Sequence, residues 1–233
     1  MGSPEDEPER FDGEGPRHPV TLTRGFWLAD SACTQALWRV LKGADPSRFT
    51  GDEQRPVERV SRDEVQRFLR KLEAPLPGWL IGLPTEAEWE YAGRAGSDTP
   101  FSFGANITPE VVNYNGNYPY AGGEKGLYRE ETVPVKSLPP NAWGLYEMHG
   151  NVWEWCADGL RDFDEQEELD PVGPVNAKKA GCPTGSGQVE KNNHVHALLQ
   201  RLRARPRARP GRAEPLLRSG ARGGGAGGRW AFT

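Results

Sequence analysis

The amino-acid sequence predicts an α+β protein built from short strands, few helices and long irregular loops. Only three segments carry a clear helix start signal, and each of them is short. The chain contains 29 Gly and 21 Pro, the residues that most often interrupt regular elements and form turns. The range 96–136 is rich in Gly, Asn, Pro and Tyr and has little periodicity. A chain of 233 residues is most simply one domain.

Each expected helix has its own start signal. Thr34 precedes an apolar stripe at helical spacing that reaches Lys42. Ser61 opens a capping box, and the helix that it begins should end before Pro75. Thr85 opens a second capping box ahead of a short helix that should stop at Gly93. The glutamates of this last helix could form an acid/base set, but first-turn carboxylates favour a helix N-terminus, so we interpret them as scaffold.

Two short strands are expected between His18 and Asp30. Apolar residues alternate with Thr before Arg24-Gly25, and aromatic residues gather after it, which is typical of strands on either side of a turn. The irregular range 96–136 comes later in the chain. Loops of this length inside a compact domain are usually functional. We therefore expect this loop to be functional or to be braced by a metal ion.

Charge divides the chain into two parts. Residues 175–233 hold 12 Lys and Arg against 2 Asp and Glu, so residues 1–174 hold 29 − 12 = 17 basic against 33 − 2 = 31 acidic residues. Residues 1–174 therefore carry a net charge of −14, and residues 175–233 carry a net charge of +10. We predict one folded but incomplete domain over residues 1–174, and a disordered or non-native Arg/Gly/Pro-rich tail over residues 175–233.

The tail has two interpretations. The Arg/Pro/Ala/Gly composition from Arg201 to Arg222 is what GC-rich coding DNA yields in a wrong reading frame, and this predicts a frameshifted C-terminus. The rival interpretation is a nucleic-acid-binding tail, because Arg-rich runs gain affinity by releasing counterions. No aromatic residues are interleaved with the arginines for base stacking. Nucleic acid is therefore not an expected partner.

The cysteines indicate a reduced compartment. Cys33, Cys156 and Cys182 are an odd number without metal-type spacing, so neither a disulfide framework nor a zinc site is expected. No apolar run approaches the ~18 residues that a membrane span needs. The first ten residues are acidic, unlike the basic start of a signal peptide. We expect a cytoplasmic protein without a membrane partner.

The stretch from Pro139 to Asp158 combines three Trp with Gly and Asn, as in a buried corner. Glu154 lies between two of these Trp, so its carboxylate must find a partner or stay hydrated. In one interpretation Glu154, the side chain of Asn151 and nearby carbonyls freed by Gly150 form a calcium pocket. In the other, the carboxylate satisfies a backbone turn, and spacing alone leaves both open. His149 has no second His or Cys at ligand spacing, which favours a structural role.

Two long segments resemble the formylglycine-generating enzyme (sulfatase-modifying factor) family. Asn141 to Trp155 reads N-A-W-G-L-Y-E-M-H-G-N-V-W-E-W, and Leu83 to Ala92 reads L-P-T-E-A-E-W-E-Y-A; both are similar to hallmarks of that family. D-P-S-R-F from Asp45 and R-P-V-E-R-V-S from Arg55 add to the resemblance, which covers the range 1–175. It implies a C-type-lectin-like fold of short antiparallel strands, with the family's first strand and its closing C-terminal strands missing.

The resemblance also implies one structural calcium ion. The family's calcium ligands correspond here to Asn113, Glu147, Gly150, Val152 and Glu154. Glu147 stands where the family often has Asp or Asn, whereas Asn113 and Glu154 match well. The family's second calcium site has an Asp ligand that we cannot place in this chain. We therefore expect a single ion.

The activity implied by the resemblance is copper-dependent oxidation of a client sulfatase cysteine to formylglycine. The family binds copper through the two cysteines of a C-x-R-S-x-C segment, and thiolates suit Cu(I). This chain has no such segment, and Cys182 stands alone in its surroundings. We expect a member of the family without a copper site and without that activity. The other hypothesis is a non-catalytic C-type-lectin-like module, and in either case the expected partner is a ligand, a peptide or a protein client.

Overall fold

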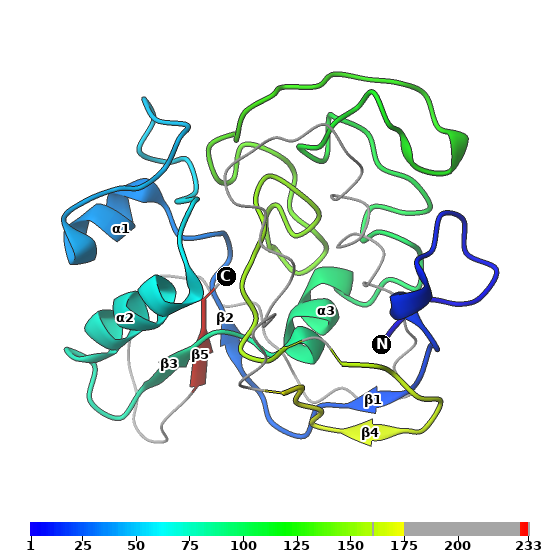
Figure 1. Cartoon of the computed structure of the whole chain (residues 1–233), viewed down its shortest axis with the longest axis horizontal. Helices are drawn as coiled ribbons and strands as arrows, with labels where there is room; N and C mark the ends of the chain where they lie inside the picture. The colour runs from blue at the N-terminus through cyan, green and yellow to red at the C-terminus, as the bar shows by residue number, and fades with distance from the viewer. Residues whose placement is uncertain (160, 175–228, 233) are drawn as a thin grey trace.

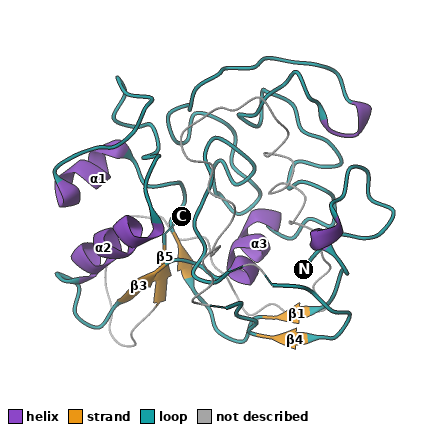
Figure 2. Cartoon of the chain, viewed as in Figure 1, coloured by secondary structure: helices purple, strands orange, loops and turns teal. Residues whose placement is uncertain are grey.

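The structure confirms the α+β class. The computed structural model describes residues 1–159, 161–174 and 229–232. The helices are α1 (Gln35–Lys42), α2 (Arg62–Glu73) and α3 (Glu86–Arg94), with 3-10 turns at Asp12–Glu14 and Tyr120–Gly122. The strands are β1 (Val20–Thr21), β2 (Trp27–Leu28), β3 (Leu80–Gly82), β4 (Glu168–Leu169) and β5 (Arg229–Ala231). Loops connect these short elements over most of the described chain (Figure 2).

The three helices begin where the sequence predicts. The Thr34 hydroxyl accepts a hydrogen bond of 3.2 Å from a first-turn backbone N–H of α1. Ser61 and Thr85 each complete a capping box with the glutamate three residues later. These contacts satisfy N–H groups that have no partner inside the helix, and so they define the helix starts. α3 runs past the predicted stop at Gly93 and ends where Ala95 adopts a left-handed conformation.

The strand ladders are parallel, which corrects the expected antiparallel arrangement. β5 lies between β2 and β3 in one sheet, and β1 pairs with β4 in a second. Antiparallel pairing occurs in the described residues only as isolated bridges. Paired strands lie far apart in the chain and no hairpin turn joins them, so no local turn signal could indicate their direction.

β5 comes from the range that the charge division assigns to the tail. Its backbone exchanges hydrogen bonds with both neighbouring strands, and Ala231 is fully buried. We expected the closing C-terminal strands to be missing, yet β5 lies between β2 and β3 in the sheet. Hydrogen bonds between paired strands use main-chain N–H and C=O groups, so the amino-acid composition of a segment alone does not reveal that it forms a strand. Residues 175–228 lie outside the described residues, so the boundary at 174 and the disordered or non-native tail stay predictions.

The helices occupy two different environments. α1 and α2 lie side by side at one edge of the molecule, whereas α3 lies near its centre, below the long loops (Figure 1). Trp38 of α1 stacks on Phe68 of α2 with ring centroids 4.9 Å apart, and Leu69 and Leu83 complete this buried cluster. No helix of the described residues is long and apolar enough to cross a membrane.

α3 is enclosed by protein on nearly all sides. Its glutamates are buried, and Glu90 pairs with Arg94 at 3.0 Å within the helix. The carboxylate of Asp158 accepts a hydrogen bond of 2.9 Å from the N–H of Glu86 and one of 2.8 Å from Gly173. Asp158 therefore connects the start of α3, the end of the tryptophan-rich corner and the last described loop.

Candidate metal centre at the tryptophan corner

The range 139–158, called the corner below, is built from tight turns. Glu147 and Asn151 both adopt left-handed backbone conformations, with φ of 52° and 71°. The N–H of Gly150 donates to the carbonyl of Glu147 at 3.3 Å, and the N–H of Val152 donates to that of Gly150 at 2.9 Å. A Cβ on Gly150 would lie 2.6 Å from the carbonyl oxygen of Asn113. Glycine is therefore required where the corner approaches the Asn113 loop.

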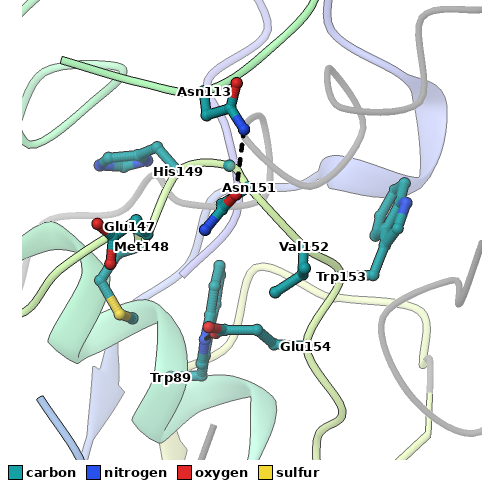
Figure 3. Close-up of a pocket in the computed structure, with 10 residues that line it drawn as sticks. Trp89, Asn113, Glu147, Met148, His149, Asn151, Val152, Trp153 and Glu154 are labelled. Atoms are coloured by element: carbon teal, nitrogen blue, oxygen red, sulfur yellow. Dashed lines mark hydrogen bonds between the residues drawn. The ribbon is translucent and has the colours of Figure 1, made fainter. Parts of the chain in front are cut away.

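A cavity of about 90 Å³ lies against the corner (Figure 3). Its lining is Trp89, Asn113, Glu147, Met148, His149, Gly150, Asn151, Val152, Trp153 and Glu154. All five predicted calcium ligands are in this set, so the fold brings them to one place. Trp89, Met148, His149 and Trp153 were not predicted there. Trp89 comes from α3, far away in the chain, and no local signal could have connected it with the corner.

Two asparagine side chains hold the loops around the cavity. The side-chain N–H of Asn113 donates to Asn151 Oδ1 at 3.0 Å, dashed in Figure 3, and to the carbonyl of Glu131 at 2.9 Å. Asn151 Oδ1 also accepts from the N–H of Val133 at 2.8 Å, and Asn151 Nδ2 donates to the Val133 carbonyl at 3.0 Å. The Asn151 amide is thus occupied by protein contacts. The oxygen left for a ligand is Asn113 Oδ1.

Glu147 is a partly desolvated carboxylate. Its Oε2 accepts a hydrogen bond from the N–H of Lys136 at 3.2 Å. Its Oε1 is buried and has no hydrogen-bond partner in the described part of the chain. Burial raises the pKa of Glu147 above its ordinary value, against the lowering effect of nearby backbone N–H groups. A buried anionic oxygen of this kind is stabilised by a cation.

Glu154 approaches the cavity from the other end of the corner. It is only 7% exposed, and its Oε2 accepts a hydrogen bond from the indole N–H of Trp89. Figure 3 shows the Glu154 carboxylate beside the edge of the Trp89 ring. A neutral indole N–H orients a carboxylate without neutralising its charge. The hydrogen bond to Trp89 thereby holds the Glu154 carboxyl group in place.

His149 forms one wall of the cavity and is 2% exposed. Its Nε2 lies 3.0 Å from the backbone N of Ser102 and 2.7 Å from the Ser102 hydroxyl. A backbone N–H can only donate, so this contact assigns Nε2 as the acceptor and puts the ring proton on Nδ1. Burial, aided by the charge of Arg94, lowers the pKa of His149 to about 3, so the ring is neutral. Nδ1 is buried without a hydrogen-bond partner among the described residues.

Comparison with known proteins assigns the family. The family model for the sulfatase-modifying factor enzyme 1-like domain matches residues 1–222. The chain belongs to this family. The formylglycine-generating enzyme of Thermomonospora curvata is 39% identical over 177 residues, which cover 71% of this chain and 52% of the enzyme. The chain spans about half the length of the curated relatives it matches.

Solved structures share the fold of this sulfatase-modifying-factor-like chain. PvdO from Pseudomonas aeruginosa matches with a TM-score of 0.56 and 27% identity, over 81% of this chain and 74% of PvdO. Treponema denticola variable protein 1 matches with a TM-score of 0.52 and 26% identity, over 65% of this chain and 71% of that protein. The C-type-lectin-like sulfatase-modifying-factor fold expected from the sequence is confirmed.

The cavity residues of this family member fit a hard cation. Calcium is bound by carboxylate, amide and main-chain carbonyl oxygens, and Glu147, Glu154, Asn113 and the backbone at Gly150 and Val152 supply these types. Groups of three His, Cys, Asp or Glu able to hold a metal do not occur in the described ranges. A site here would therefore depend on carbonyl oxygens as well as side chains. When bound, calcium would supply the positive charge that the unpartnered Glu147 oxygen lacks.

The described cysteines do not fit copper. Cys33 packs against the α1–α2 cluster, and burial raises the pKa of its thiol to about 12. Cys156 is 1% exposed and belongs to a different cluster, with Trp89 and Met148. Within the described residues, neither forms a disulfide. Copper(I) requires accessible thiolates that converge, and neither residue provides one. Cys182 lies outside the described residues.

Proposed function

We propose that this chain is a calcium-braced, non-catalytic member of the formylglycine-generating enzyme family that serves as a ligand- or protein-binding module. The observation that carries the proposal is the cavity at the corner, where all five predicted ligand positions line one space. This arrangement supports a hard-cation site, whereas Cys156 is buried and burial raises the pKa of the Cys33 thiol to about 12. Because the chain spans about half of its curated relatives, their activity is not transferred to it.

Calcium would act as a brace between distant parts of the chain. Asn113 lies in the long loop, whereas Glu147 and Glu154 lie at the two ends of the inner turn of the corner. An ion held by these three side chains and by the carbonyls of Gly150 and Val152 connects the loop to the corner. It also neutralises two partly buried carboxylates, which removes the cost of keeping them charged in a cavity.

The long loop provides the surface for binding. Tyr118 and Leu127 are 49% and 58% exposed, which is high for large apolar side chains. They lie within a loop whose base is closed by a bridge between Asn115 and Tyr128. Exposed apolar groups on loops held by a rigid scaffold are typical of ligand contacts.

Calcium binding is tested by thermal unfolding of the purified chain in EDTA and in calcium. At a calcium concentration of 100 times Kd we expect about 2.7 kcal/mol of stabilisation. For a chain of this size that corresponds to a rise in Tm of about 5–10 °C. Magnesium at the same concentration should produce a smaller rise, because it keeps its waters more strongly. No rise with calcium would refute the brace.

The absence of catalysis is tested separately. The chain is loaded with copper and incubated in air with a C-x-P-x-R peptide, and mass spectrometry follows conversion of the peptide cysteine to formylglycine. We expect no conversion, while an active formylglycine-generating enzyme converts the same peptide in parallel. Conversion by this chain would refute the non-catalytic assignment. The binding role is tested by calcium-dependent capture of a ligand from a peptide library, which Tyr118→Ala should weaken.

A further inference from the structure

His18 has a hydrogen-bond acceptor against each of its two ring nitrogens. It lies two residues before β1, and its side chain is fully buried. Nδ1 is 3.1 Å from the carbonyl oxygen of Pro16, and Nε2 is 2.9 Å from Oε2 of Glu168, the first residue of β4. A carbonyl can only accept a hydrogen bond, and so can an ionised carboxylate. Both ring nitrogens therefore need a proton, which makes the ring an imidazolium cation.

Glu168 is kept in its ionised form by Arg161. The Arg161 guanidinium contacts both oxygens of the carboxylate, with Nη2 2.6 Å from Oε2. Although burial acts to raise it, hydrogen bonds and charge from Arg161, aided by His18, lower the pKa of Glu168 below its ordinary value. A two-pronged contact of this kind favours the carboxylate over the neutral acid. The proton between His18 and Glu168 is thus carried by the ring.

Loss of one ring proton would break one of the two contacts of His18. A neutral imidazole carries a single N–H. If Nδ1 keeps it, the lone pair of Nε2 faces the Glu168 carboxylate, and if Nε2 keeps it, the lone pair of Nδ1 faces the Pro16 carbonyl. Because the ring is fully buried, water cannot supply the missing donor. Histidine is also the side chain whose charge changes most readily near neutral pH.

The His18–Glu168 contact joins two very short strands. β1 and β4 pair over two residues each and lie side by side at the lower edge of Figure 1. The Asp170 carboxylate, just after β4, accepts a hydrogen bond of 2.7 Å from the backbone N–H of Thr23. Hydrogen bonds from Thr23 lower the pKa of Asp170, so this second contact changes only in acid. Near neutral pH the pairing of β1 with β4 therefore depends on the charge of His18.

We propose that His18, Glu168 and Arg161 form a pH-sensitive clasp, which holds β4 against β1 while the His18 ring carries two protons and loosens β4 when the ring loses one. The clasp does not depend on the proposed calcium site. Its effect extends to α3, because Gly173, after β4, donates to the Asp158 carboxylate at 2.8 Å, and the same carboxylate accepts from the first N–H of α3.

The amine of Met1 lies next to the clasp and titrates with the opposite sign. It donates to the backbone carbonyl of His18 at 2.9 Å, and burial lowers its pKa from 8.0 to about 6. Between these values the unfolded chain binds a proton that the folded chain does not, so this contribution to stability grows as pH rises. The contribution of the clasp falls as pH rises, because the folded chain holds the extra proton. Besides Glu168, the charged side chains that interact with the amine are Arg17, Glu90 and Arg94.

Two measurements on the wild-type chain in EDTA test the clasp. Nitrogen-15 NMR should show protons on both ring nitrogens of His18 at about pH 6 and on only one at about pH 9. Hydrogen exchange follows the Asp170 N–H, which donates to the carbonyl of Thr21 at 2.9 Å. After correction for the intrinsic exchange rate, its protection should fall about tenfold between these pH values. The Val57 N–H, which donates to the Cys33 carbonyl at 2.8 Å, should keep its protection.

Substitutions at two neighbouring carboxylates provide a matched pair. Glu168→Gln removes the negative charge but offers an oxygen and an N–H, so it can bond either form of the His18 ring. The pH response of the Asp170 N–H should therefore shrink from about tenfold to less than about twofold. Glu167→Gln changes the adjacent carboxylate, which accepts from the Thr21 hydroxyl at 3.3 Å, and should keep the wild-type response.

Three results would overturn the clasp. The first is a His18 ring with a single proton at about pH 6, and the second is equal protection of the Asp170 N–H at both pH values. The third is an equal loss of the pH response in Glu167→Gln and Glu168→Gln, which would assign the response to net charge and not to His18. The first two results need no variant, so they decide the matter even if Glu168→Gln does not fold.

Discussion

The α1–α2 region and the corner represent two ways of stabilising a small core. In the first, Trp38, Phe68, Leu69 and Leu83 form an apolar cluster between two capped helices. In the second, Trp89 and Met148 pack together beside a cavity whose lining includes Glu147 and Glu154. Apolar burial contributes roughly 25 cal/mol per Å² and needs no bound ion. Buried carboxylates are costly unless a counter-charge accompanies them, so we expect the stability of the corner, unlike that of the helical region, to depend on the cations in solution.

The largest expected effect tests the apolar half of this comparison. Phe68→Ala removes a ring that is 2% exposed and stacked on Trp38. We expect the free energy of unfolding to fall by about 3–5 kcal/mol, because the transfer energy of the ring is lost and a cavity remains. Urea unfolding should show the same loss in EDTA and in calcium. A loss that depends on calcium would mean that the two regions are not independent.

The next effect tests the corner. Glu154→Gln keeps an oxygen that can accept from Trp89 but removes the negative charge. We expect the stabilisation by calcium, about 2.7 kcal/mol at 100 times Kd, to be largely lost, while stability in EDTA changes little or increases. Differential scanning calorimetry at both conditions measures this. Glu64→Gln, which changes an exposed carboxylate on α2, is the matched control and should keep the full calcium response.

A smaller effect compares the two capping boxes. Thr85 at the start of α3 is buried, whereas Ser61 at the start of α2 is exposed. Ser61→Ala should cost about 1 kcal/mol, because water can replace the lost hydrogen bond to the helix N–H. Thr85→Ala should cost about 2 kcal/mol, at the upper end of the range, because water has less access there. If urea unfolding shows the same loss of unfolding free energy for both variants, burial of the capping residue does not affect its contribution to stability.

The smallest effect concerns pH. Hydrogen bonds from the Ser61 hydroxyl and backbone N–H hold the pKa of Glu64 below its ordinary value of 4.5. Because the folded-state pKa is the lower one, this stabilisation is present above pH 4.5 and is lost as pH falls through the folded-state pKa. Glu64→Gln should therefore flatten the stability profile slightly below pH 4.5 and leave the profile near neutral pH unchanged. A steeper acid loss in the variant would contradict this.

The helices could be predicted because their signals are local. The Thr34 hydroxyl contacts the first turn of its own helix, and Ser61 and Thr85 each form a capping box with the glutamate three residues later. All of these contacts lie within one helical turn, so residues that are close in the sequence are also close in the structure. The parallel pairing of β5 with β2 and β3 could not be predicted in this way. It joins segments from opposite ends of the chain, and nothing near either strand indicates its partner.

The candidate site was partly predictable. Glu147, Gly150, Val152 and Glu154 belong to one motif, and resemblance to a known family identified Asn113 as well. The sequence did not predict that Trp89 and His149 line the cavity. Trp89 reaches the cavity because α3 packs beside the corner, and His149 was interpreted only as structural because no second metal-type ligand lies near it in the chain.

The sequence alone specifies the helices, the class of fold and the family. It does so through capping boxes, turn-forming glycines and the tryptophan-rich motif, each of which spans only a few residues of the chain. The burial of the α3 glutamates, the parallel insertion of β5 and the cavity shared by Asn113, Glu154 and His149 arise only when distant segments pack together. Packing sets which polar atoms lose water. The carboxylate of Glu147 and the imidazole of His149 acquire their chemistry from that loss of water, which no local pattern encodes.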